Sequence, residues 1–350
     1  MRFHWLKMVA AAAVVLATTG TATAGADAST GLTIRVDGTR LVNGAGQSVQ
    51  LRGVNRDGTE YACVQGWGIF DGPSDAPSVA AIKSWHVNAV RIPMNEDCWL
   101  GINGLNPAYS GLNYQKAIVN YVKLLRQQGI YAILDLAVVD PGTIVASGLQ
   151  PMPDQSHSTW FWKSVANRFK ATPSAIFDLF NEPYPDNNTD STAAWTCWEK
   201  GGICPGVSYK AAGMQQLVNV VRSTGATNVL MLPGIGYASV LDQWGAYKPA
   251  DPLNQLAASF HNYYFGGCTT AACWNANLTD VGAVPLLTDE MGFAGYIDSY
   301  MTWADSHHKG YLAWTWDTWG CSGGQALISD YSGTPCSPYG SDYQQHLLSR

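Results

Sequence analysis

The stretch Ile176–Pro185, IFDLFNEPYP, has the pattern of a buried strand that ends abruptly in polar residues. Short apolar runs rich in branched and aromatic side chains are typical of strands covered on both faces of a sheet. Here the run stops at Asn181 and Glu182, and Pro183 restricts the backbone directly after the acid. We therefore predict a buried strand that presents an amide and a carboxylic acid at its carboxyl end.

Runs of this kind recur along the chain. In order they are VQLRGVN (49–55), VNAVRIP (87–93), YAILDLA (131–137), IFDLFNEP (176–183), NVLMLPG (228–234), AASFHNYY (257–264), VPLLTDEMG (284–292) and YLAWTWD (311–317). Segments with helical periodicity lie between them, as in residues 113–129 and 158–172. This alternation of strand and helix predicts an α/β fold, a (β/α)8 TIM barrel. A doubly wound open sheet is the weaker alternative, because no Gly-rich turn follows the first run.

The N-terminal region carries two further signals. Residues 32–51 contain two alternating stretches separated by turn residues, which predicts a short β-hairpin. Residues 1–28 combine Arg2 and Lys7 with an apolar run and then small residues, the pattern of a secretory signal peptide. The apolar run is shorter than the ~20 residues that span a bilayer, so a membrane anchor is the weaker alternative. We expect a secreted, extracellular protein in which residues 29–350 form a single domain.

Composition restricts the class of partner. Without residues 1–28, which hold Arg2, Lys7 and Asp27, 18 basic and 25 acidic side chains remain. This net negative charge makes nucleic acids and anionic membranes poor partners. Charged residues make up only 13% of the chain, whereas tryptophan occurs 14 times. Such a surface favours a neutral, hydroxyl-rich ligand that stacks on aromatic rings, such as a carbohydrate. We expect a monomer.

The chain has eight cysteines, an even number that in a secreted protein indicates disulfides. Sequence alone does not determine the pairing. We expect the local pairs Cys63–Cys98, Cys197–Cys204, Cys268–Cys273 and Cys321–Cys336, which would pin surface loops. Metal binding by cysteines is the weaker alternative, because the sequence has no Cys-x-x-Cys pair and no Cys/His cluster. We expect no metal or organic cofactor.

The carboxyl ends of the predicted strands hold the candidate site, because barrel enzymes place their active-site groups there. These ends carry Asn55, Arg91, Ala137, Asn181, Glu182, Gly234, His261, Tyr263, Glu290, Trp314 and Trp316. Taken singly, each has a structural explanation, such as an ion pair or a core histidine. Together they suit glycosidic bond cleavage, in which one carboxyl group protonates the leaving oxygen and another attacks the anomeric carbon or activates water. A cation such as Arg91 would favour ionised Glu290, whose charge would in turn keep Glu182 protonated.

On the stretches LRGVN, NAVRIP, IFDLFNEP, FHNYY, LLTDEMGF and AWTWD, the chain resembles glycoside hydrolase family five. The resemblance implies a retaining β-glycosidase that acts by double displacement on a β-linked glucan- or mannan-type saccharide or a glycoconjugate. It implies Glu182 as acid/base and Glu290 as nucleophile. It also implies that Arg91 and Tyr263 orient the nucleophile and that Asn181 contacts the 2-hydroxyl of the sugar. His261 would position the acid/base. Trp314 or Trp316 would form a floor under the sugar.

The third run departs from the family pattern. It ends in Ala137, where the family usually has a histidine that holds the sugar, and we expect Asp140 or a different sugar to fill that space. The loop after the first run carries Tyr61 and Trp67, which either bind sugar or pack the loop onto the barrel. Two other functions stay open: a non-catalytic carbohydrate-binding protein on the same scaffold, and a transglycosylase.

Overall fold

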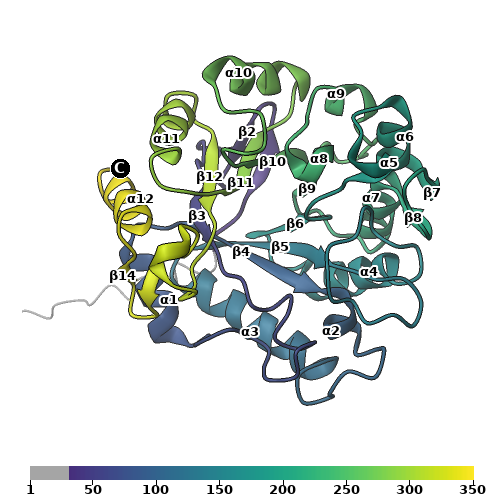
Figure 1. Cartoon of the computed structure of the whole chain (residues 1–350), viewed down its shortest axis with the longest axis horizontal. Coiled ribbons are helices and arrows are strands. Elements are labelled where there is room, and N and C mark those ends of the chain that lie inside the picture. The colour runs from purple at the N-terminus through teal and green to yellow at the C-terminus, as the bar shows by residue number, and fades with distance from the viewer. Residues whose placement is uncertain (1–30) are drawn as a thin grey trace, which may run out of the picture.

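The computed structural model describes residues 31–350, so the predicted signal peptide lies outside the described residues. Eight parallel strands form a closed barrel in which the last strand pairs with the first (Figure 1). The barrel strands are β3 (Arg52–Asn55), β4 (Ala89–Asn95), β5 (Tyr131–Val138), β6 (Ala175–Asp178), β9 (Leu230–Pro233), β10 (Leu256–Asn262), β11 (Leu286–Met291) and β12 (Gly310–Ala313). One of these strands falls in each apolar run, which confirms the predicted (β/α)8 barrel.

Helices surround the strands (Figure 1). The longer ones are α1 (Ala76–Ser84), α3 (Leu112–Gln127), α4 (Ser158–Phe169), α6 (Thr192–Lys200), α7 (Met214–Ser223), α10 (Ala271–Asp280), α11 (Ile297–Ser306) and α12 (Tyr339–Leu348). Short helical segments are α2 (Glu96–Leu100), α5 (Pro185–Asn188), α8 (Ile235–Ala238), α9 (Trp244–Tyr247) and η1 (Cys321–Gly323). Small two-stranded sheets pair β1 (Arg35–Asp37) with β2 (Arg40–Val42), β7 (Gly201–Ile203) with β8 (Lys210–Ala212), and β13 (Ile328–Asp330) with β14 (Thr334–Pro335).

Burial explains the apolar character of the strands. Every residue of β4, β5 and β10 is buried, as expected where helices cover the outer face and side chains fill the interior. Close packing also demands a glycine in β3. A Cβ atom on Gly53 would lie 2.1 Å from the carbonyl oxygen of Ala89 on the neighbouring strand, so a larger side chain would force these strands apart.

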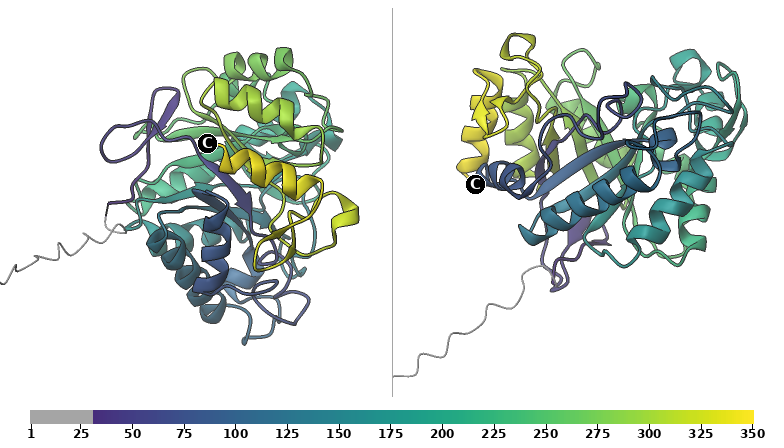
Figure 2. Two further views of the ribbon diagram at one scale, coloured as in Figure 1. Left: turned by 90° about the vertical axis from the view of Figure 1, so that its left-hand side faces the viewer. Right: turned by 90° about the horizontal axis from the view of Figure 1, so that it is seen from below.

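The N-terminal hairpin closes one end of the barrel. Ile34 and Leu41 pack into an apolar cluster with residues from the first halves of the strands, including Leu51 and Ile176. In the right-hand view of Figure 2, the purple hairpin lies at the lower end of the barrel. Since it covers the amino ends of the strands, the opposite, carboxyl end stays available for a site.

All four predicted disulfides are present: Cys63–Cys98, Cys197–Cys204, Cys268–Cys273 and Cys321–Cys336. Each joins segments outside the barrel strands, so the bonds pin surface loops as expected. The helices formed by residues 31–350 are all too short or too polar to cross a bilayer.

Candidate active site

Two glutamates meet at the carboxyl end of the barrel. Glu182 follows β6, and Glu290 lies near the end of β11. His261 on β10 stands between them, because the strand register pairs it directly with Glu290. Its Nδ1 lies 2.9 Å from Glu182 Oε1 and 3.5 Å from Glu290 Oε2. One oxygen of each glutamate and one ring nitrogen of His261 all lie within 4.8 Å of one another.

Glu290 is held from both sides. Arg91 Nη1 donates to its Oε1 at 2.8 Å, and the Tyr263 hydroxyl donates to its Oε2 at 2.8 Å. Arg91 is fully buried and also donates from Nη2 to Asn181 Oδ1 at 2.8 Å. Arg91 therefore orients the glutamate and the amide from below. Because Arg91 is buried, it positions other groups and does not line a cavity. Tyr263 and Asn181 do line the cavities described below.

A layer of buried aspartates lies under the site, and the sequence analysis did not identify it. Arg91 forms ion pairs with Asp178 (2.9 Å), Asp135 (3.1 Å) and Asp289 (3.3 Å). Each aspartate stands inside an apolar run of the sequence. This position could have indicated a buried ion pair, because an acid flanked by buried residues needs a partner. The pattern does not show which cation meets these acids, because that depends on pairing between strands distant in sequence.

Burial and neighbouring charges set the protonation of this layer. Burial raises the pKa of Asp135 to about 7 although Arg91 opposes the shift. Burial also raises the pKa of Asp178 well above its usual value. Asp289 behaves differently: burial acts to raise its pKa, but His261 and Arg91 together lower it below the usual value. The layer therefore holds one firmly ionised aspartate beneath the histidine and the arginine.

His261, which lies between the two glutamates, is protonated. Burial acts to lower the pKa of His261, but Glu290 and Asp289 raise it well above its usual value, so the ring stays protonated. Burial raises the pKa of Glu290, while His261 and Arg91 lower it. Arg91 thus acts on Glu290 in the direction that the sequence analysis predicted, but burial has the larger effect.

Two adjoining cavities share the glutamates. The larger, of about 560 Å³, is lined by Glu182, Glu290, Trp314, Tyr237 and Phe265 among others. The smaller, of about 210 Å³, is lined by the same two glutamates, Trp314, and residues from the loops after β3 and β5. The pair of acids therefore lies where the two cavities meet, with Trp314 beside both.

The second predicted floor residue, Trp316, is in a different place. It is fully buried, and its ring packs edge-on against Trp85 with centroids 4.8 Å apart. Trp314 and Trp316 would point the same way only if the strand continued through both residues, but β12 ends at Ala313. Trp316 is therefore a core residue and is dropped from the substrate-binding set.

Trp67 is half-exposed and belongs to a line of aromatic rings that leads to the site. Its centroid lies 6.0 Å from Tyr61, which lies 6.5 Å from Trp319, which in turn lies 6.2 Å from Trp314. Trp319 was not among the predicted binding residues. The disulfide Cys63–Cys98 fixes the loop that carries Tyr61 and Trp67.

The space beside Ala137 is part of the smaller cavity, which Glu60 and Leu149 also line. Asp140, expected as one occupant, instead accepts a hydrogen bond from Gln150 Nε2 at 2.9 Å. Glu60 Oε2 accepts from the Gly58 amide at 2.7 Å, and burial raises the pKa of Glu60 to about 8. A carboxylic acid that is neutral at pH 7 therefore stands beside the two glutamates, and the sequence analysis did not select it.

Comparison with known proteins places this geometry in a family. The model of "Cellulase (glycosyl hydrolase family 5)" matches residues 42–320. The chain belongs to glycosyl hydrolase family 5. Among curated relatives of this family 5 member, the manganese dependent endoglucanase Eg5A of Phanerodontia chrysosporium is 25% identical over 206 residues, which are 56% of this chain and 46% of the relative. The cellulase CelDZ1 of Thermoanaerobacterium sp is 21% identical over 243 residues, 69% of this chain and 54% of the relative. The chain spans about half the length of these curated relatives.

Solved structures share the fold of this family 5 member. The β-glucanase SdGluc5_26A from Saccharophagus degradans, in complex with cellotetraose, superposes with a TM-score of 0.68 at 19% identity and covers 91% of this chain and 93% of its own. A β-mannanase from Streptomyces thermolilacinus gives a TM-score of 0.62 at 22% identity, with 88% and 93% covered. At these low sequence identities, the similarity shows a shared fold and nothing more.

Proposed function

We propose that this family 5 member is a secreted, retaining β-glycoside hydrolase that acts on a β-linked glucan- or mannan-type saccharide. The observation that carries the proposal is the spacing of the acids, because oxygens of Glu182 and Glu290 lie within 4.8 Å of each other. Retaining glycosidases hold their carboxyl groups about 5 Å apart, whereas inverting enzymes need roughly 6.5–9.5 Å to admit a water. The substrate class follows the names of the relatives and is a proposal for this chain.

The surroundings of the two acids support separate roles. Glu290 receives hydrogen bonds from Arg91 and Tyr263, which fix its orientation for attack on the anomeric carbon. Glu182 contacts His261, and its side chain is 16% exposed against 7% for Glu290. Greater exposure suits a group that must exchange protons with solvent and the leaving oxygen.

The proposed reaction has two displacements. Glu290 forms a bond to the anomeric carbon while the glycosidic bond breaks and Glu182 gives its proton to the leaving oxygen. Water then attacks the same carbon, Glu182 takes its proton, and Glu290 leaves. A sugar hydroxyl in place of water would give transglycosylation, and the cavity space on both sides of the acids admits either acceptor. We also propose that residues 29–350 act as one catalytic unit without a cofactor.

The first experiment separates the two glutamates. Glu290→Ala should abolish turnover of β-glucan and β-mannan and of an activated aryl β-glycoside, because no covalent intermediate forms. Glu182→Ala should lose roughly 10²–10⁴-fold on the polymer, whose leaving group needs protonation. It should keep the first step on the activated aryl glycoside. Glu199→Ala, which removes a glutamate on α6 away from the acids, is the matched control.

Stereochemistry provides the second readout. NMR of the first product should show the β-anomer from the wild type. Azide added to Glu290→Ala should restore aryl release and yield the α-glycosyl azide, since azide attacks from the face that Glu290 leaves open. Full activity of Glu290→Ala would remove it as nucleophile, and an α-anomer from the wild type would show inversion. Binding of oligosaccharide with no product would favour the non-catalytic alternative.

A further inference from the structure

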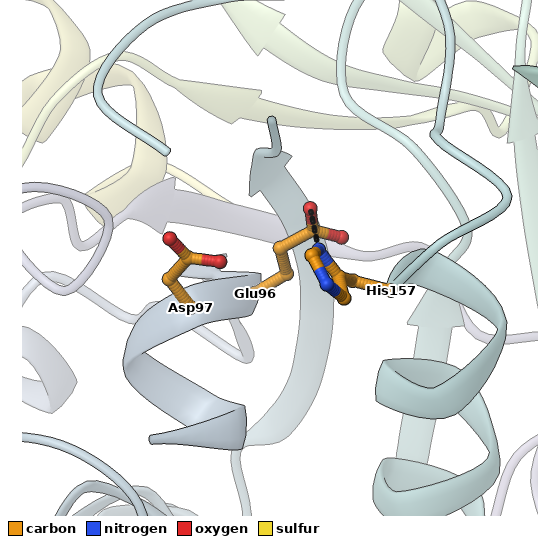
Figure 3. Close-up of side chains that lie close together, drawn as sticks. All are labelled: Glu96, Asp97 and His157. Carbon is orange, nitrogen blue, oxygen red and sulfur yellow. Dashed lines mark ion pairs between the residues drawn. The ribbon is translucent and has the colours of Figure 1, made fainter. Parts of the chain in front are cut away.

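A second cluster of titratable side chains lies outside the proposed active site. Glu96 and Asp97 begin α2 directly after β4, and His157 immediately precedes α4. Figure 3 shows Glu96 and His157 meeting from these two elements, with Asp97 beside them on α2. One potential ligand atom from each lies within 4.8 Å of the other two. Glu96 and Asp97 are fully buried, and the His157 side chain is 19% exposed, which leaves a route to solvent.

The two oxygens of Asp97 have different environments. Oδ2 accepts hydrogen bonds from the Ala146 amide at 3.0 Å and from Asn103 Nδ2 at 2.8 Å. Oδ1 is buried, yet no hydrogen-bond partner reaches it from any residue of the described chain. A buried carboxylate oxygen without a partner is costly. The side chain is therefore oriented through one oxygen while the other is available to a ligand.

The acids of this cluster face a histidine but no lysine or arginine of residues 31–350. His157 Nδ1 lies 3.9 Å from Glu96 Oε1, 3.9 Å from Asp154 Oδ1 and 3.4 Å from the carbonyl oxygen of Asp140. Within residues 31–350, no lysine or arginine forms an ion pair with Glu96, Asp97 or Asp154. Ser158 Oγ donates to Glu96 Oε2 at 2.9 Å and the Asp140 amide donates to its Oε1 at 3.0 Å, so hydrogen bonds orient this carboxylate but bring no positive charge. A bound cation would supply it.

We propose that Glu96, Asp97 and His157 bind a divalent cation, with the Asp154 carboxylate and the Asp140 carbonyl beside it. Carboxylate and carbonyl oxygens select hard ions such as Ca²⁺, Mg²⁺ and Mn²⁺, and an imidazole shifts the preference toward a transition metal. Mn²⁺ satisfies both conditions. Neighbouring ligands at right angles around an ion with bonds of roughly 2.2 Å lie about 3.1 Å apart. The His157 ring nitrogen lies 3.4–3.9 Å from the neighbouring oxygens, so these donors would move slightly closer together on binding.

The ion would clamp the loop between β5 and α4. The Asp140 amide donates to Glu96 Oε1 at 3.0 Å, and the Ala146 amide donates to Asp97. The same loop carries Leu149, which lines the smaller cavity beside the glutamates. A cation bound to Glu96 and Asp97 would hold the two side chains that accept hydrogen bonds from this loop. It would therefore stabilise both the fold and one wall of that cavity.

The test uses the tag-free chain, stripped with EDTA and exchanged into chelator-free buffer. Isothermal titration calorimetry with MnCl₂ should give one site, and MnCl₂ at a concentration 100-fold above its Kd should raise Tm by about 4 °C. Electron paramagnetic resonance should show the free Mn²⁺ signal decrease at one equivalent. Asp97→Asn and His157→Gln should each lose this binding, while Asp330→Asn at an exposed position should retain it.

Each outcome bears on the proposal. Tighter binding of Mn²⁺ than Ca²⁺, lost in both variants, supports it. Tighter binding of Ca²⁺, or full Mn²⁺ binding by His157→Gln, would remove the imidazole ligand and overturn the assignment. The absence of heat, Tm shift and resonance change with the folded wild type would overturn the site altogether. These measurements use no substrate, so they are independent of the glycosidase proposal.

Discussion

Arg91 determines the geometry of several acidic groups at once. It donates to Glu290 and Asn181, and its charge also faces buried aspartates under the site. Lysine could not replace it, because the bonds leave three different nitrogens of a planar guanidinium. One buried side chain thereby holds both the proposed nucleophile and the amide next to the proposed acid.

The protonation of Glu60 should make the activity of the enzyme depend on pH. Its neutral carboxyl group can donate a hydrogen bond to a sugar in the smaller cavity, and its pKa of about 8 means that it loses this donor above that pH. Wild-type kcat/KM should therefore fall as the pH rises through 8. In Glu60→Gln the amide keeps a donor at every pH, so this fall should disappear.

Profiles of kcat/KM between pH 5 and roughly 9.5 check this, with Glu60→Ala as the control that lacks a donor throughout. An unchanged fall near pH 8 in Glu60→Gln would show that another group titrates there. Stability should change in the same sense. Because the folded pKa is raised above the ordinary value of 4.5, the contribution of the neutral acid is complete below pH 4.5 and is lost as the pH rises through 8.

Loops fixed by disulfides shape the surroundings of the site. Cys63–Cys98 joins the loop after β3, which bears Tyr61 and Trp67, to α2 across 35 residues. Cys197–Cys204 spans only 7 residues in the insertion after β6. Longer closed loops restrict the unfolded chain more, so the two bonds should differ in their contribution to stability.

Removal of the longer-range bond should cost more. The double variant Cys63→Ala/Cys98→Ala should lose about 4 kcal/mol of unfolding free energy, and Cys197→Ala/Cys204→Ala about 2 kcal/mol. Guanidinium unfolding monitored by tryptophan fluorescence measures both under the same conditions. Equal losses, or the reverse order, would show that native packing of the loops outweighs the entropy of the unfolded chain.

Closure of the barrel joins the first and last strands and the helices beside them. Strand β12 pairs with β3, and Asp305 at the end of α11 joins the surrounding elements. It accepts hydrogen bonds from Arg52 on β3 at 2.9 Å and Gln50 at 2.8 Å, and it contacts His346 on α12 at 2.9 Å. Figure 2 shows the C-terminal helix α12 lying across this seam.

Asp305→Asn should destabilise the whole barrel by about 1.5–3 kcal/mol, because it weakens hydrogen bonds to charged groups. Burial opposes it, but Arg52 together with His346 and Gln50 lowers the pKa of Asp305 below its usual 3.8. Its contribution is therefore present above pH 3.8 and is lost as the pH falls through the folded pKa. The variant should lose less stability than the wild type between pH 4 and roughly 2.

Thermal unfolding at several pH values measures this difference. Asp298→Asn, at an exposed position on the same helix, provides the control and should match the wild type. An identical acid dependence in Asp305→Asn and the wild type would show that other carboxylates control the loss of the barrel in acid.

The local disulfide pairs were an expectation that the folded chain confirmed, whereas the apolar runs alone predicted the barrel and the place of Glu182 and Glu290 at strand ends. These follow from local periodicity and spacing, which a linear pattern records. The tertiary structure decided that Trp316 is a core residue, that aspartates surround Arg91, and that Glu60 stands beside Ala137. Burial, protonation and hydrogen bonding depend on neighbours from distant strands, and only the folded chain brings those neighbours together.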